Sequence, residues 1–200
     1  MNAYEKVLKS REKGRPTAVK YIGSIVENFI ELHGDRRFAD DKAIIGGIGT
    51  ISGMPVTVIG IEKGDGTADK IAHNFGCAHP EGYRKAVRLM KEAEKFRRPV
   101  LCFVDTSGAY CGIGAEERGQ SEAIATSILE MIRLKTPTLS IIIGEGGSGG
   151  ALSLCAADEV WITSNSTYSV ISPEGCASIL WKDSGKVAEA RSEERRVGKE

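Results

Sequence analysis

The sequence predicts an α/β fold in which helices pack on a largely parallel β-sheet. Apolar residues recur at helical spacing before residue 34, and runs such as PVTVIGIE and PVLCFV are typical of buried strands. After residue 80, segments of the two kinds alternate along the chain. Strands that alternate with helices need crossover connections, so neighbouring strands are expected to run parallel.

Three elements are expected in the first half of the chain. Residues 17–33 carry apolar side chains at three- and four-residue spacing and are followed by Gly34, which predicts one amphipathic helix. Residues 44–52 and 55–62 are β-branched runs separated by a turn, and they predict a hairpin. Pro80 suits the first turn of a helix, which is expected to run to about residue 98.

The second half is expected to alternate strands, loops and helices. Strands are expected at 99–104, 138–143, 159–163 and 167–171, and helices at about 115–134, 150–157 and 174–180. Two glycine-containing loops, 105–114 and 144–150, each join a strand to a helix.

Composition excludes several classes of protein. The 27 basic residues balance 27 acidic ones, so a dedicated nucleic-acid binder is not expected. No apolar run approaches the ~20 residues needed to cross a bilayer. Residues 1–10 lack the apolar core of a secretory signal, so a cytoplasmic location is expected. The five cysteines contain no C-x-x-C pair, which predicts reduced thiols and no zinc site.

Residues 144–150 (GEGGSGG), called the glycine loop below, are the strongest candidate for a functional site. Unpaired N–H groups at a helix start and the helix dipole together favour negative charge. With no Cβ atoms in the way, a substrate oxygen can come within hydrogen-bonding distance of the Gly149 and Gly150 amides. The loop is therefore suited to a developing oxyanion.

Three other motifs overlap the glycine loop, and the rest of the sequence disfavours each. A G-x-G-x-x-G dinucleotide fingerprint needs an acid after the next strand, where residues 164–166 are Ser-Asn-Ser. A G-x-S-x-G elbow would make Ser148 a nucleophile, but all three histidines precede it, so the base would have to come from another chain. A P-loop needs Lys and then Ser or Thr after Gly149, where Gly150 and Ala151 stand.

Ordinary structural roles remain open for several residues. Ser148 is expected to be a helix N-cap, the position that serine favours. The 105–114 loop can be a simple connection. His73 and His79 have no further metal ligands at suitable spacing. The basic face of the helix at 81–98 is expected to be solvated, with contact to ligand phosphates as the alternative.

Five long stretches of the sequence carry a family resemblance: FADDKAIIGGIG, PEGYRKAVRLMKEAEKF, DTSGAYCGIGAEERGQSEAIA, IIIGEGGSGGALSL and STYSVISPEGCASILWK. They resemble the α subunits of bacterial acetyl-CoA carboxylase carboxyltransferase over about residues 16–190. The resemblance implies the crotonase-like (ClpP/crotonase) fold, a superhelix of β-β-α units with an N-terminal helix. It divides the chain into an N-terminal helical segment at 1–34 and a carboxyltransferase domain at 35–190 that is incomplete at its C-terminus.

The same resemblance implies an activity and its partners. The enzyme would transfer the carboxyl group from carboxybiotin, held on the biotin carboxyl carrier protein, to acetyl-CoA, and form malonyl-CoA for fatty-acid biosynthesis. No cofactor would be bound covalently to this chain, and no metal would be bound in it. The implied partners are a zinc-binding β subunit in an α2β2 heterotetramer, the carrier protein and biotin carboxylase.

By resemblance, the Gly149 and Gly150 amides form the oxyanion hole for the biotin ureido oxygen, and the β subunit supplies a matching pair for the thioester. No side-chain base is needed in this chain, because the ureido anion can accept the acetyl proton. The implied substrate-binding residues lie in the two loops: Gly108, Ala109, Tyr110, Gly112, Ile113, Gly114, Gly146 and Gly147.

The chain departs from the family pattern at two places. Ser107 and Cys111 stand where the family usually has prolines, so the 105–114 loop is expected to be less rigid. Asp65 replaces an arginine, and Cys77 and Ala78 replace a Met-Pro pair, which weakens the case for a phosphate contact there.

The sequence is compatible with two other functions, and its last ten residues are unusual in composition. A biotin-dependent decarboxylase or propionyl-CoA-type carboxylase subunit would share the fold, although the PEGCASILW run argues against it. A non-catalytic subunit that only completes its partner's pocket is the second alternative. Residues 191–200 (RSEERRVGKE) are expected to be non-native, because they are highly charged and begin abruptly after Ala190.

Overall fold

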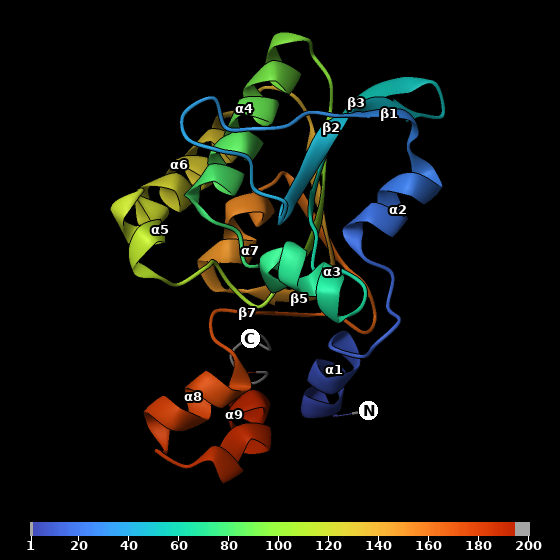
Figure 1. Ribbon diagram of the computed structural model, residues 1–200. Helices are drawn as coiled ribbons and strands as arrows, with labels where there is room; N and C mark the ends of the chain where they lie inside the picture. The colour runs from blue at the N-terminus through green and yellow to red at the C-terminus, as the bar shows by residue number, and fades with distance from the viewer. Residues whose placement is uncertain (1, 195–200) are drawn as a thin grey trace.

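The computed structural model describes residues 2–194 and contains a mixed sheet with helices on both faces (Figure 1). Within those residues the strand order is β1-β2-β3-β4-β5-β6, and β7 pairs with the end of β5. The strands are β1 (Glu27–Glu31), β2 (Ile44–Ile51), β3 (Met54–Ile61), β4 (Val100–Thr106), β5 (Thr138–Gly147), β6 (Glu159–Ile162) and β7 (Thr167–Ser169). Strands β1 to β3 pair antiparallel and β3 to β6 pair parallel, which confirms both the hairpin and the parallel sheet.

Helices cover the two faces of the sheet unequally. The helical segments are α1 (Ala3–Ser10), α2 (Ala18–Ile25), α3 (Thr67–Ala72), η1 (Asn74–Gly76), α4 (Pro80–Lys95), α5 (Ile113–Glu117), α6 (Gln120–Arg133), α7 (Ser148–Cys155), α8 (Pro173–Leu180), η2 (Ser184–Lys186) and α9 (Val187–Glu194). Helices α4, α6 and α7 lie on one face, and α2 lies on the other. Figure 1 shows α8 and α9 below the sheet, on the same side as α1, which contacts α9.

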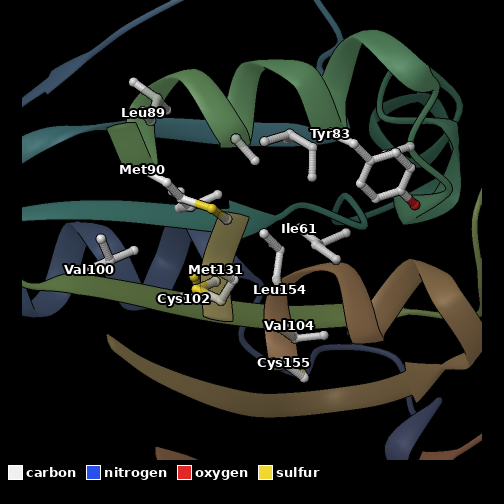
Figure 2. Packing of buried hydrophobic residues seen from close by; sticks show 14 of the residues in the cluster. Ile61, Tyr83, Leu89, Met90, Val100, Cys102, Val104, Met131, Leu154 and Cys155 are labelled. Carbon is white, nitrogen blue, oxygen red and sulfur yellow. The ribbon is translucent and has the colours of Figure 1, made fainter. Parts of the chain in front are cut away.

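The larger core lies under α4, α6 and α7. Met90 of α4, Met131 of α6 and Leu154 of α7 meet the strand residues Cys102 and Val104 (Figure 2). All five are almost fully buried. Full burial of a Val, Leu or Met side chain contributes about 1.5–3 kcal/mol, so this layer stabilises the packing of α4, α6 and α7 on the sheet.

The expected helix at 17–33 is wrong in its second half. Helix α2 ends at Ile25, and the chain turns into β1, with Asn28 in the left-handed region at φ 52°. A Cβ atom on Gly47 of β2 would collide with the backbone oxygen of Ile30, so this glycine lets β1 approach the hairpin. Pairing with β2 outweighs the helical periodicity, because tertiary contacts override local preference.

Two other boundaries also differ from expectation. The helix expected at 115–134 is divided into α5 and α6 at Gly119, whose φ of 80° favours glycine. Strand β5 continues to Gly147, so most of the predicted loop at 144–150 is strand, because Glu145 to Gly147 pair with β7. The prediction for residues 191–200 concerns a segment of which 195–200 lie outside the described residues.

Candidate functional site

The carboxyl ends of β4 and β5 bring the two predicted loops into direct contact. The strands are parallel neighbours, so the 105–114 loop and the glycine loop leave the sheet at the same edge. Three glycines face the 105–114 loop: a Cβ would collide with the Asp105 side chain at Gly144 and with the Ser107 backbone at Gly147. At Gly150 it would lie 2.6 Å from the backbone nitrogen of Ala109. The backbones therefore approach more closely than side chains would allow.

Gly149 and Gly150 lie in the first turn of α7, where backbone N–H groups have no intrahelical acceptor. Over residues 2–194, neither N–H has a hydrogen-bond acceptor. Gly150 is buried beneath Gly108 and Ala109, whereas Gly149 is half-buried. The pair can donate to an oxygen that carries negative charge.

The prediction that Ser148 is the N-cap of this helix is wrong. The N-cap position is Gly147, without a side-chain capping bond, and Ser148 is the exposed first residue of α7. Its φ of 52° lies in the left-handed region, which costs a non-glycine residue about 1–2 kcal/mol. Ser148 therefore lies outside the core, directly before the two glycine amides.

Part of the 105–114 loop lines an open cavity of about 370 Å³. Ala109, Tyr110 and Cys111 form one side, and Ile71 and Phe75 are among the residues of the other. The Tyr110 ring stacks on His79, with 4.0 Å between ring centroids. The cavity is lined largely by apolar and aromatic side chains next to the Gly108–Ala109 contact with α7, as ligand sites commonly are.

The remaining predicted site residues lie elsewhere. Gly146 and Gly147 line a small cavity of about 20 Å³ together with Ser107. Gly112 stands next to the Tyr110 ring, where a Cβ would lie 2.8 Å from a ring carbon. Ile113 and Gly114 begin α5, and Ile113 is 81% exposed. The structure therefore brings Gly108 and Ala109 to the start of α7, places Tyr110 beside them in the cavity lining, and leaves Ile113 exposed at the start of α5.

A cluster of charged residues beneath the glycine loop was missed by the sequence analysis. Lys63 Nζ lies 2.5 Å from Glu145 Oε2 and 3.4 Å from Asp105 Oδ1. Arg11 Nε donates to Glu145 Oε1 at 2.6 Å, and Arg11 also pairs with Glu174. These four residues, Arg11, Lys63, Asp105 and Glu145, are called the charged cluster below. They line a cavity of about 330 Å³.

Burial and pairing compete within this cluster. Burial alone would raise the pKa of Glu145, but the charges and hydrogen bonds of Lys63 and Arg11 hold it below its ordinary value. Burial dominates at Asp105 and raises the pKa of that carboxyl despite Lys63. Burial opposes the ammonium of Lys63, yet the two carboxylates keep its pKa above the ordinary value. Lys63 is thus held as a cation between them.

The basic face of α4 is largely occupied by pairing within the chain. Arg84 Nε donates to Asp35 at 2.8 Å, and Arg88 pairs with Glu92. No group of three or more His, Cys, Asp or Glu side chains that could hold a metal occurs in the described part of the chain. The same part contains no helix long and apolar enough to cross a membrane.

A family model described as acetyl co-enzyme A carboxylase carboxyltransferase-like matches residues 1–196. The acetyl-coenzyme A carboxylase carboxyl transferase subunit alpha of Ruminiclostridium cellulolyticum is 65% identical over 189 residues, which are 94% of this chain and 73% of that protein. A Natranaerobius thermophilus protein named as subunits beta/alpha is 61% identical over 190 residues, covering 95% of this chain and 31% of that one.

Solved structures share the fold at low sequence identity. Transcarboxylase 12S aligns with a TM-score of 0.77 at 17% identity, over 94% of this chain and 36% of that chain. The beta subunit of P. aeruginosa geranyl-CoA carboxylase aligns with a TM-score of 0.72 at 18% identity, over 97% and 38%. The chain thus spans just over a third of the length of these proteins.

The sheet, its helical layers and these likenesses define a crotonase-type fold of the kind that carboxyltransferases use. Biotin-dependent carboxyl transfer is the class of reaction. The chain belongs to the acetyl-CoA carboxylase carboxyltransferase family, where it corresponds to the α subunit and therefore works with a β subunit.

Proposed function

We propose that this chain forms the carboxybiotin side of an acetyl-CoA carboxylase carboxyltransferase, which forms malonyl-CoA for fatty-acid biosynthesis. The observation that carries the proposal is the pair of backbone amides at Gly149 and Gly150, which have no acceptor among residues 2–194, with Gly150 packed against Gly108 and Ala109 of the 105–114 loop. Carboxyl transfer generates negative charge on a ureido oxygen and on a thioester oxygen, and backbone N–H groups stabilise such charge without reorganising.

The chemistry divides between the bound group and the protein. Carboxybiotin, when bound, supplies an activated carboxyl group. Gly149 and Gly150 donate to its ureido oxygen, and their stabilisation grows as charge develops there. Ala109 and Tyr110 offer an apolar wall next to these donors, which orients a ring and excludes water. Gly108 and Gly112 of the 105–114 loop, and Gly146 and Gly147 of the glycine loop, are the further residues proposed to contact the substrate.

The other half of the reaction belongs to partners. A zinc-binding β subunit supplies the amides for the acetyl-CoA thioester, and the two subunits assemble as α2β2. The biotin carboxyl carrier protein delivers carboxybiotin after biotin carboxylase has loaded it, all in the cytoplasm. This chain holds neither a covalent cofactor nor a metal in that scheme.

The experiment compares the purified chain alone, the β subunit alone and the two together. Malonyl-CoA formation and biocytin carboxylation are measured in each. Activity is expected only in the mixture, because only one of the two oxyanion sites lies on this chain. Activity that persists when Gly150 is replaced by valine in a folded complex would leave this chain as a non-catalytic scaffold.

A further inference from the structure

Three neighbouring strands each contribute one member of the charged cluster. Lys63 follows β3, Asp105 lies at the end of β4, and Glu145 lies near the end of β5. Because β3, β4 and β5 are parallel, their carboxyl ends meet at one edge. Asp105 and Glu145 are mostly buried, with side-chain exposures of 8% and 11%. The cluster therefore lies where both functional loops begin.

The β4–β5 pairing is irregular at this point. The register shifts between Val104 and Thr106, and the backbone N–H of Glu145 donates to Asp105 Oδ1 at 2.9 Å. The side chain of Asp105 thus contacts the first part of the glycine loop directly, and Gly144 leaves room for it. Lys63 binds both carboxylates, so it ties the ends of the two strands together.

Without Lys63, two buried carboxylates would face each other with only Arg11 to balance them. Arg11 Nε donates to Oε1 of Glu145, whereas Lys63 binds Oε2 of the same carboxylate. Like charges at short range in a poorly solvated site repel, or one of them takes up a proton. Either outcome should change the spacing of the two strand ends, near which Gly150 lies too close to Ala109 to carry a Cβ atom.

We propose that Lys63 is a positioning residue for carboxyl transfer: by bridging Asp105 and Glu145 it holds the 105–114 loop against the glycine loop and thereby fixes the direction of the Gly149 and Gly150 amides. This inference rests on the proposed function, since it concerns the same site. Lys63 does not contact the reacting atoms; it acts through the two strand ends.

The test uses the complex with the β subunit and the variant Lys63→Met, which keeps the length of the side chain and removes its charge. We expect kcat to fall roughly 10- to 100-fold, the range typical of lost supporting contacts and small misplacements. The KM for the acyl-CoA substrate should change little, because its thioester site lies on the partner. Lys63→Arg should restore most of kcat. The matched control is Lys20→Met, which removes an exposed pair with Asp65 and should leave kcat unchanged.

The pH dependence separates positioning from a general loss of structure. In Lys63→Met, protonation of one carboxylate removes the repulsion, so relative activity should recover as the pH falls from about 8 to about 6. The double variant Lys63→Met/Asp105→Asn should recover activity without a change in pH. Besides Arg11, which belongs to the cluster, the charged groups near it are Glu174, which pairs with Arg11, and the residues that line the same cavity: Glu12, Lys13, Arg15, Asp65 and Lys70. The two variants leave all of them unchanged.

Hydrogen exchange supplies a readout that is independent of activity. The peptide covering residues 144–151 should exchange faster in Lys63→Met than in the parent complex, and Lys20→Met should not differ. If the parent complex transfers no carboxyl group but exchange is still faster in Lys63→Met than in the parent, the proposed function is overturned, while the role of Lys63 in holding the two loops together stands. An unchanged kcat in Lys63→Met, or an equal loss in Lys63→Arg with no recovery in the double variant, overturns the inference.

Discussion

Gly150→Ala is the sharpest test of the contact between the two loops. An ideal Cβ at Gly150 lies 2.6 Å from Ala109 N, 2.7 Å from Gly108 C and 3.1 Å from Gly108 Cα, all of them backbone atoms. Ordinary contacts of this kind lie at about 3.5–4.0 Å, so the 105–114 loop must withdraw by about 1 Å. Overpacking of this size costs about 1–3 kcal/mol of unfolding free energy. A displacement of about 1 Å in an active site can cost about 100-fold in rate.

The assay measures malonyl-CoA formation by the complex with the β subunit, together with the melting temperature of each variant. The melting temperature of Gly150→Ala should fall by about 2–4 °C for each kcal/mol lost. Two controls accompany it. Gly149→Ala puts a Cβ 3.4 Å from Ile124 Cγ2, an ordinary contact, so its melting temperature should stay close to that of the parent. Gly23→Ala, in open space on α2, should keep full activity and gain about 0.5–1 kcal/mol.

The reasoning fails if Gly150→Ala keeps both the parent activity and the parent melting temperature. It also fails if Gly149→Ala and Gly150→Ala lose equal stability, because only the second meets the backbone of the 105–114 loop.

Three further predictions concern single residues. Ser148→Gly should raise the free energy of unfolding by about 1 kcal/mol, because glycine adopts the left-handed φ without strain. Ser148→Ala should keep transfer activity. Loss of activity in a folded Ser148→Ala protein would restore the nucleophile hypothesis. Burial alone would raise the pKa of Asp40, but hydrogen bonds and the charge of buried Lys85 lower this pKa to about 2. The ionised Asp40 carboxylate therefore stabilises the fold above about pH 4, and this contribution is lost as the pH falls through about 2. Asp40→Asn should therefore lower the urea midpoint at neutral pH and differ less from the parent near pH 2, and an equal difference at both pH values would contradict the pairing. Gly47→Ala should lower the free energy of unfolding, measured by chemical denaturation, by about 1–3 kcal/mol or more, because its Cβ would collide with the backbone oxygen of Ile30. A denaturation midpoint equal to that of the parent would show that β1 does not pack against Gly47.

The order of strands from residue 44 onward, and helices α4, α6, α7 and α8, were predictable because local pattern and tertiary packing agree there, whereas α3 and α9 were not predicted. The runs that became β3, β4 and β5 are mostly buried strands, and Pro80 opens α4 as its residue type suggests. Strand β1 was not predictable from periodicity. Its apolar residues have helical spacing, and the reason for strand pairing lies in Gly47, far away in the sequence.

The candidate site was only partly predictable. The glycines at 149 and 150 could be selected because a glycine-rich segment preceded a predicted helix. The charged cluster left a weaker signal: Lys63 and Asp105 directly follow the predicted strands at 55–62 and 99–104, and parallel strands bring such positions together. Arg11 left no signal, because its contact with Glu145 depends on how α1 docks against the sheet.

The glycines at 144, 147 and 150 recur every third residue, and each faces a different part of the stretch from Asp105 to Ala109. At Gly147 and Gly150 the atoms in the way belong to the backbone of the other stretch, so no side-chain change there can make room for a larger residue. Only at Gly144, which faces the side chain of Asp105, could a second substitution compensate for a larger residue. Anyone who grafts this site into a related carboxyltransferase must transfer both stretches as one unit, since either one alone would meet a surface shaped for a different partner.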